Sequence, residues 1–466
     1  MSMEMVFDHS NYIVREMQVQ KEQLRYRAYE NIVYVSKPVS APHQSLNVYV
    51  PECYYEGGAI NGYTIDTAPI FFPNAVGGYS PAKPMKPEIK KDGTENIVLQ
   101  ALARGYVVIS AGARGRGMKN ENGENIGVAP ACIVDLKAAV RYIKWNKNYI
   151  PGDVNKIISN GTSAGGALSA LLGSTGNHPD FEDYLSEIGC APAEDNIFAA
   201  SCYCPITNLE NADKSYEWEF LGINEGHWWH GDFSLSDEQI KMSEELRNLF
   251  PIYLSSLELK DLAQGNVNDE AALKRYILSY VKTSLQKAID SGIDIPEYDW
   301  VVTKGDKESG KKVISIDWNG YIKFRTRMKP VPAFDSITMG TPENELFGNL
   351  LNDNRHFTPF AMMHSKEAME HAEKTKEKEF YAGEMQIKMM NPMHYIKDSQ
   401  AIKAGFFRIR HGAIDRDTSL AISAILTLVL QMENVEVDYF LPWGIPHAGD
   451  YDPDELFMWI EKICKA

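Results

Sequence analysis

Short apolar runs, most of them unbroken by polar residues, are separated along the chain by stretches with helical periodicity. An unbroken run is typical of a strand buried on both faces of a sheet. The predicted strands cover residues 46–51, 68–73, 106–110, 199–206, 405–410 and 435–441, and the predicted helices cover 94–104, 129–149, 237–250 and 270–289. Asp135, Lys137 and Arg141 are assigned to the polar side of the second helix. The alternation of strand and helix predicts an α/β protein with a mostly parallel sheet flanked by helices.

One strand–turn–helix segment, residues 156–172, presents a serine between glycines. A short apolar strand leads into Gly161-Thr-Ser163-Ala164-Gly165, and a helix of small residues follows. The G-x-S-x-G pattern is typical of a nucleophile elbow, in which a sharp turn exposes the serine hydroxyl above the sheet. The N–H of Ala164, at the start of the helix, then points toward a developing oxyanion. The alternative interpretation is a glycine-rich helix start with an ordinary serine.

A glycine pair follows the second predicted strand, within residues 74–79. This is the place where an α/β hydrolase forms the other half of its oxyanion hole. We therefore expect the Gly77 N–H to be the second oxyanion donor and Gly78 to lie against the substrate, with a plain glycine loop as the alternative. Arg114 and Arg116 follow the next strand among further glycines, and we expect them to brace a loop rather than to bind an anion.

Acidic and histidine residues follow the last two predicted strands. Asp415 and Asp417 come after the penultimate strand, and His447 comes after the last one. The order serine, acid, histidine is that of an α/β-hydrolase fold, in which the carboxylate orients an imidazole that takes the serine proton. The sequence predicts a triad of Ser163, Asp415 and His447, with Asp417 as the alternative acid. His411 is interpreted as structural or pocket-lining.

About 190 residues of a different character separate the strands at 199–206 and 405–410. They are rich in aromatic and acidic residues and are too many for a loop. We predict an inserted lid subdomain at 207–396, which divides the hydrolase core into residues 1–206 and 397–466. Within the lid, Asn319-Gly320 predicts a β-hairpin turn.

Charge and composition restrict the classes of partner. The chain has 47 basic and 63 acidic residues and a formal net charge of −16, which disfavours nucleic acid and anionic membrane surfaces. Six scattered cysteines are interpreted as free thiols in a reducing compartment. Because neither a signal peptide nor a bilayer-spanning run is evident, we expect a soluble cytoplasmic protein. His227 and His230 lack a third ligand, so no metal is expected.

With these motifs in place, the chain resembles the bacterial tannases (tannin acyl hydrolases) and their feruloyl-esterase-like relatives. The likeness extends from about residue 70 to the C-terminus and includes the predicted lid. It rests on residues 73–79, 161–166, 203–209, 216–218, 391–393, 410–417 and 447–452.

The resemblance implies a serine esterase that needs no cofactor and uses the triad and oxyanion donors named above. In family members that cleave gallate esters, a lid lysine, a lid glutamate and a core aspartate grip the three galloyl hydroxyls. The aspartate matches Asp417. The corresponding lid stretch, Ala333–Phe360, contains no lysine; its charged candidates are Glu343, Glu345, Asp353, Arg355 and His356. Of these, Asp353, Arg355 and His356 are the expected substrate contacts.

The sequence therefore predicts a serine carboxylic-ester hydrolase that acts on a small-molecule ester of a phenolic acid, such as gallate or ferulate. Three alternatives remain: a serine peptidase of the same fold, a general short-chain carboxylesterase, and a binding protein that keeps the fold without catalysis. The oligomeric state is left open.

Overall fold

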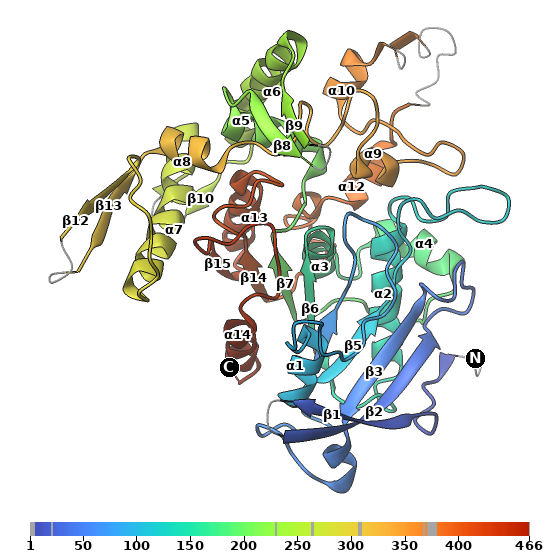
Figure 1. Cartoon of the computed structure of the whole chain (residues 1–466). Coiled ribbons are helices and arrows are strands. Elements are labelled where there is room, and N and C mark those ends of the chain that lie inside the picture. The colour runs from blue at the N-terminus through green and yellow to red at the C-terminus, as the bar shows by residue number, and fades with distance from the viewer. Residues whose placement is uncertain are drawn as a thin grey trace.

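A nine-stranded sheet forms the centre of the computed structural model (Figure 1). The structure describes residues 5–465 except 20–21, 229–230, 262–264, 306–309, 367–368 and 371–379. In spatial order the strands are β1 (Ile13–Val19), β2 (Glu22–Val33), β3 (Ser45–Pro51), β5 (Val107–Ala111), β4 (Pro69–Pro73), β6 (Asp153–Thr162), β7 (Ala199–Tyr203), β14 (Phe406–Arg410) and β15 (Glu436–Phe440). The pairs from β1 to β5 are antiparallel, and those from β5 to β15 are parallel. The predicted mostly parallel α/β sheet is confirmed.

The helices that flank the sheet follow the predicted alternation. They are α1 (Ile97–Ala103), α2 (Ala131–Trp145), α3 (Ala164–Ser174), α4 (Glu182–Glu187), α13 (Leu420–Met432) and α14 (Pro453–Lys465). Every residue of α3 is buried, and so are the first eleven residues of α13. The side chains of α3 are small, so this helix packs closely on the two adjacent strands β6 and β7.

The polar residues of α2 do not face solvent, contrary to the expectation from periodicity. Asp135 and Lys137 are fully buried, and Arg141 is nearly so. Asp135 pairs with Arg114 at 2.8 Å, and Lys137 Nζ lies 2.7 Å from Asp195 Oδ1. Arg141 reaches the other oxygen of Asp195, also at 2.7 Å. A buried charge is tolerated when it is paired in this way, so these residues tie α2 to its neighbours.

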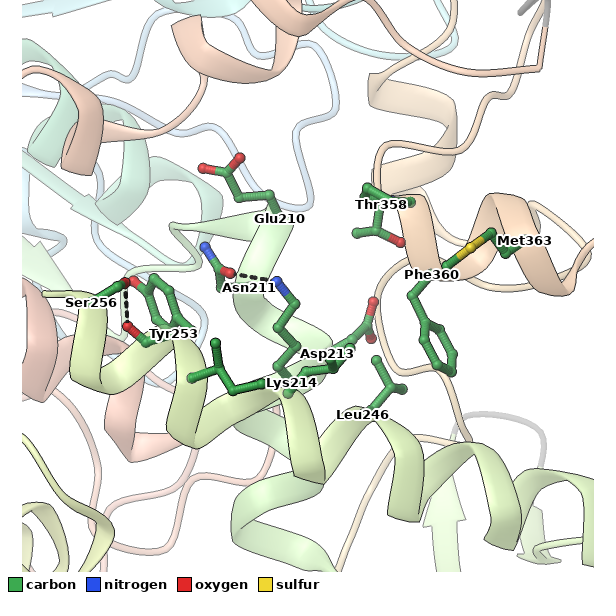
Figure 2. A pocket seen from close by; sticks show the side chains of 13 residues that line it. Glu210, Asn211, Asp213, Lys214, Leu246, Tyr253, Ser256, Thr358, Phe360 and Met363 are labelled. Atoms are coloured by element: carbon green, nitrogen blue, oxygen red, sulfur yellow. Dashed lines mark hydrogen bonds between the residues drawn. The ribbon is translucent and has the colours of Figure 1, made fainter.

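Between β7 and β14, no described residue joins the central sheet. This segment lies at the top and at the left of the sheet as drawn in Figure 1. Its elements are α5 (Leu209–Phe220), β8 (Glu225–Trp228), β9 (Gly231–Ser234), α6 (Asp237–Ser256), β10 (Lys260–Asp261), β11 (Gly265–Asn266), α7 (Glu270–Asp290), β12 (Val301–Lys304), β13 (Lys312–Ile316), α8 (Trp318–Arg325), α9 (Pro342–Leu346), α10 (Pro359–His364) and α12 (Glu384–Met389). A cavity of about 430 Å³ lies among α5, α6 and α10 (Figure 2).

The hairpin predicted at Asn319-Gly320 is wrong. Both residues lie in the first turn of α8, where the Asp317 side chain caps the helix by accepting the Gly320 N–H at 2.7 Å. The hairpin is the preceding pair, β12 and β13. A Cβ on Gly320 would lie 2.2 Å from Trp300 Cβ, so this glycine permits a close helix contact rather than a turn.

Two further expectations concern segments outside the sheet. Trp229 and His230, in the histidine–tryptophan stretch, lie outside the described residues, and the His227 side chain is exposed and pairs with Asp232. Among the helices that the structure describes, none has both the length and the apolar character needed to cross a bilayer.

Candidate active site

The strand β6 ends directly before Ser163, which starts α3 in a strained backbone conformation. Ser163 has φ 61° and ψ −122°, a region that non-glycine residues rarely occupy. A Cβ on Gly161 would lie 2.3 Å from the carbonyl oxygen of Gly165, so the turn closes only with glycine there. The Ser163 N–H donates to Tyr203 O of the adjacent strand at 3.0 Å. These features give the strand–turn–helix geometry of a nucleophile elbow.

The loop after β4 lies against this turn and is held at both ends. Asn74 Nδ2 donates to Gly165 O at 3.2 Å. At the other end, Arg116 Nε donates to Gly78 O at 2.6 Å, and Arg116 also pairs with Glu345. The structure therefore confirms that Arg116 braces a loop. Gly77 and Gly78 line the same cavity as Ser163 and Ala164.

In the part of the chain that the structure describes, the amides of Gly77 and Ala164 have no hydrogen-bond partner. Both residues border the cavity in which the Ser163 side chain lies. Two such N–H groups beside a nucleophile form the arrangement that stabilises a tetrahedral oxyanion.

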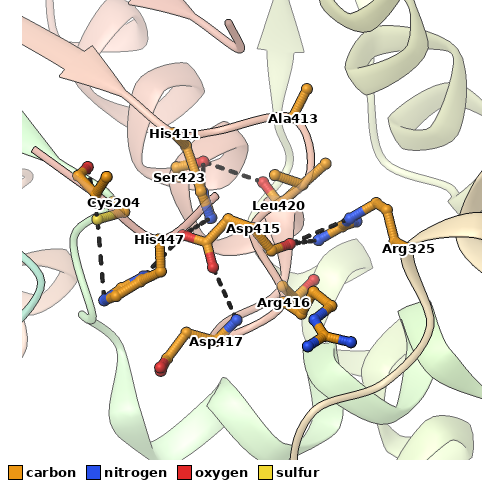
Figure 3. Close-up of polar contacts among 12 residues, drawn as sticks. Cys204, Arg325, His411, Ala413, Asp415, Arg416, Asp417, Leu420, Ser423 and His447 are labelled. Atoms are coloured by element: carbon orange, nitrogen blue, oxygen red, sulfur yellow. Dashed lines mark hydrogen bonds and ion pairs between the residues drawn. The ribbon is translucent and has the colours of Figure 1, made fainter. Parts of the chain in front are cut away.

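The imidazole of His447 is paired with Asp415, not with Asp417 (Figure 3). His447 Nδ1 lies 2.8 Å from Asp415 Oδ2. Asp415 is fully buried, and its other oxygen accepts the Asp417 N–H at 2.8 Å. Burial opposes ionisation of both partners, but their hydrogen bonds outweigh it: His411 and His447 together lower the pKa of Asp415, and Asp415 raises the pKa of His447. The carboxylate thus fixes the tautomer and stabilises the imidazolium.

Residues of α8 support the loop that carries the acid, as Figure 3 shows for Arg325. Arg325 Nε donates to the main-chain oxygen of Asp415 at 3.1 Å, and the Arg325 guanidinium also pairs with buried Glu219. The Tyr321 hydroxyl donates to Ala413 O. The segment between β7 and β14 therefore helps to position the acid as well as to cover the sheet.

His411 lies behind the acid rather than in the cavity. It is fully buried, with Nδ1 at 2.8 Å from Ser423 Oγ and Nε2 at 3.3 Å from Asp415 Oδ2. Burial lowers its pKa, so it is a neutral support for Asp415. Its structural interpretation agrees with this position, whereas a pocket-lining role does not.

His447 Nε2 lies 4.0 Å from the thiol of Cys204, and the described residues show no hydrogen bond between His447 and Ser163 Oγ. Both His447 and Ser163 line the cavity, and catalytic hydrogen bonds are often long without substrate. Cys204, Asp415 and His447 also form the one group of potential metal ligands among the described residues. Asp415 and His447 are already paired with each other, and the Cys204 thiol donates to Ala448 O at 3.4 Å, so each of the three already has a partner.

The cavity above Ser163 has a volume of about 310 Å³, and its lining includes four charged side chains, those of Arg116, Lys329, Glu343 and Asp417. Lys329 Nζ lies 2.8 Å from Asp417 Oδ1 and 3.9 Å from the centre of the Phe334 ring. Burial lowers the pKa of Lys329, but the charges of Asp417 and Glu343 outweigh it and the net shift is upward. Burial raises the pKa of Glu343. Lys329 thus offers donors, and Glu343 and Asp417 offer acceptors, next to the serine, while the Arg116 guanidinium is paired with Glu345.

The three substrate contacts predicted in residues 333–360, Asp353, Arg355 and His356, do not line this cavity. Arg355 donates to the main-chain oxygens of Phe347 and Gly348, both at 2.9 Å. His356 is fully buried against Asp335, and Asp353 is exposed and pairs with Lys119.

The lysine that faces the cavity is Lys329, which lies four residues before the stretch 333–360. Lys329 is the one charge in the otherwise apolar run Met328-Lys-Pro-Val-Pro332. This isolated charge is the sequence feature that could have pointed to a functional lysine. Glu343 was among the candidates, and the structure places it in the cavity.

Solved structures that have the same fold, and that match this chain over nearly its whole length, identify the family. The crystal structure of Fusobacterium nucleatum tannase matches with a TM-score of 0.93 at 42% identity over 99% of each chain. The chain belongs to the tannase family. Tannin acyl hydrolase from Lactobacillus plantarum matches with a TM-score of 0.91 at 41% identity, and a tannin acyl hydrolase in complex with ethyl gallate matches with 0.91 at 42%; each match covers 99% of both chains.

Two shorter matches agree with this membership. The BD-FAE family matches residues 85–251. Esterase LipC of Mycobacterium tuberculosis is 43% identical over 58 residues, which are 12% of this chain and 14% of that protein. As a member of the tannase family, the chain is a carboxylic-ester hydrolase with the α/β-hydrolase fold, as its sequence predicted.

Proposed function

We propose that the chain hydrolyses esters of phenolic acids, with gallate preferred over ferulate as the acyl group. The observation that carries this proposal is the set of Lys329, Glu343 and Asp417 in the cavity beside Ser163. A lysine donates hydrogen bonds and a carboxylate accepts them, so the three groups match a ring with several adjacent hydroxyls. Relatives crystallised with ethyl gallate and with 3,4-dihydroxybenzoate support the same substrate class.

In the proposed reaction, Ser163 Oγ attacks the ester carbonyl while neutral His447 takes its proton. The N–H groups of Gly77 and Ala164 stabilise the oxyanion, and His447 returns the proton to the leaving alcohol. Water activated by His447 then releases the acid from the acyl-enzyme. Asp415 stabilises the imidazolium in both steps.

The segment 207–396 is proposed to act as the lid subdomain, between core segments 1–206 and 397–466. Lys329 and Glu343 come from this segment, whereas Asp417 comes from the core. The acyl group is therefore held between the two parts. All six cysteines are free thiols, which supports the predicted reducing compartment.

A peptidase or a general short-chain carboxylesterase fits the cavity less well. An acyl group without hydroxyls leaves Lys329, Glu343 and Asp417 desolvated without new partners. Each lost hydrogen bond to a charged group costs about 1.5–3 kcal/mol, which lowers kcat/KM for such substrates relative to a gallate ester.

A panel of ethyl gallate, ethyl ferulate, ethyl p-coumarate and ethyl acetate tests the proposal. We expect kcat/KM to be highest for ethyl gallate and lowest for ethyl acetate. Ser163→Ala is expected to abolish turnover without changing thermal stability. Equal rates on all four esters contradict the phenolic specificity, and full activity of Ser163→Ala contradicts the mechanism.

A further inference from the structure

The cavity among α5, α6 and α10 is separate from the one above Ser163 (Figure 2). The two share no lining residue. With about 430 Å³ it is the larger of the two, and it falls in the size range of small-molecule sites.

One wall of this second cavity is apolar. Leu246 of α6 and Phe360 of α10 are buried at its base. Leu249, Ile252 and Met363 line it as well and remain 37%, 67% and 62% exposed. Large apolar side chains that remain exposed around a concavity are typical of a binding site. A ring that entered would bury them.

The opposite wall is polar and comes from a single helix face. On α5, Asp213 follows Glu210 by three residues and Lys214 follows it by four, so both side chains lie on the same side of the helix as Glu210. Among the described residues, Lys214 Nζ has one hydrogen-bond partner, Asn211 Oδ1 at 2.8 Å. An ammonium group offers three N–H donors, so Lys214 keeps donors for a ligand.

The two carboxylates have unused acceptor capacity. Glu210 Oε1 accepts from Asn391 Nδ2 and His394 Nε2, while Oε2 has no partner in the described part of the chain. The two oxygens of Asp213 each accept one main-chain N–H, those of Phe334 and Asp335. Figure 2 shows the Asp213 carboxyl pointing across the cavity toward Phe360.

Like the first cavity, the second contains one lysine, one aspartate and one glutamate, here next to the Phe360 ring, but it has no counterpart of Arg116. We propose that it is a second binding site for a polyhydroxylated aromatic ring. The ring packs against Leu246 and Phe360, and its hydroxyls bond to Lys214, Asp213 and Glu210.

Two sources of such a ring exist if the proposed function holds: a further aromatic ring of a large ester substrate, and the acid released by hydrolysis. The site itself depends only on the geometry of α5, α6 and α10. Burial and the neighbouring Asp335 raise the pKa of Asp213 to about 7, so below that pH its carboxyl also serves as a hydrogen-bond donor.

Binding is measured after the first cavity is blocked. The wild-type chain is treated with phenylmethylsulfonyl fluoride: Ser163 Oγ displaces fluoride, the serine proton is lost with it, and the phenylmethylsulfonyl group left on the oxygen fills the space above it. Gallic acid and ethyl gallate are then titrated separately by isothermal calorimetry. We expect one residual site per chain. Binding of both ligands indicates that the ring is recognised and that a substrate ring can occupy the site, whereas binding of gallic acid alone indicates the released acid. No residual binding of either ligand overturns the proposal.

Variants assign the residual site to the second cavity. Lys214→Met removes a donor, and Met363→Trp fills the cavity from its exposed rim without disturbing the core. Each is expected to weaken residual binding about tenfold or more. Lys241→Met, an exposed position on α6 outside the cavity, is the matched control and is expected to bind normally. Residual binding that neither cavity variant affects also overturns the proposal.

A failure of the second binding site can be told apart from a failure of the proposed function. Lys214→Met is expected to hydrolyse ethyl gallate at the wild-type rate, because Lys214 does not line the cavity of Ser163. If ethyl gallate is hydrolysed but the blocked protein binds no ring, only the second site is refuted. If ethyl gallate is not hydrolysed, the proposed function is refuted independently.

Discussion

Replacement of Lys329 by methionine tests the origin of the acyl specificity. The Lys329 side chain is 8% exposed, and its ammonium lies 2.8 Å from Asp417 Oδ1 and 3.9 Å from the Phe334 ring centre. Methionine keeps a similar length and the packing on Phe334 but provides no donor. The change therefore removes the charge-assisted hydrogen bond that is proposed to a ring hydroxyl and leaves the apolar contact.

The size of the effect follows from the energy of one such bond. A hydrogen bond to a charged group contributes about 1.5–3 kcal/mol, and about 1.4 kcal/mol corresponds to a tenfold change in rate. We expect Lys329→Met to lower kcat/KM for ethyl gallate by roughly 10- to 150-fold. Ethyl benzoate, which has no ring hydroxyl, is expected to change by less than about threefold.

Initial rates on the two esters, measured for both proteins, give the comparison directly. Lys323→Met, at an exposed position of α8, is the matched control and is expected to leave both rates unchanged. Lys329→Arg, which keeps the charge, is expected to fall between the wild type and Lys329→Met on ethyl gallate. An equal loss on both esters, or no loss on either, refutes the assignment of Lys329 to hydroxyl recognition.

Three further perturbations probe the acid, its support and the lid. Asp415→Asn is expected to lower kcat about 10³–10⁴-fold. Because Asp415 raises the pKa of His447, this change is also expected to move the rising limb of the pH profile of kcat/KM to lower pH. An unmoved limb contradicts His447 as the base. Arg325→Met leaves buried Glu219 unpaired, so urea denaturation is expected to show a loss of about 3–5 kcal/mol; wild-type stability contradicts the ion pair. The pKa of Asp213 is about 7 in the folded chain against 3.8 as its ordinary value, so its protonation stabilises the fold below about pH 4 and this contribution is lost as the pH rises to 7. The variant Asp213→Asn is expected to flatten the fall of the melting temperature over this range, and an unchanged slope refutes the raised pKa.

Much of the fold was predictable because its signals are local. The run 68–73 became β4 and the run 405–410 became β14, each to within one residue at either end. An unbroken apolar run has few alternatives to a buried strand. The glycine pattern around Ser163 likewise specifies a sharp turn through backbone sterics that act over five residues.

The charged residues were predicted less well, because periodicity does not say what covers a helix. Asp135 lies on the polar side of α2 by sequence, yet its ion pair with Arg114 is fully inside the protein. Asn319-Gly320 is typical of a turn, but here it lies in α8, and the glycine allows this helix to pack closely against Trp300. In both cases a long-range contact overrode the local preference.

The sequence by itself determined the parallel part of the sheet, the elbow and the order serine, acid, histidine, since chain order after successive strands brings those residues to one edge. It did not predict β1 and β2, which form the antiparallel edge. Only the tertiary structure decided which acid contacts His447 and which charges of the segment between β7 and β14 face the serine. Lys329 reaches Asp417, whereas Arg355 turns to main-chain oxygens. The reason is physical. This segment has no single period and adds no strand to the central sheet, so its side-chain directions depend on how its helices pack on one another, on α13 and on the acid loop, which sequence spacing does not encode.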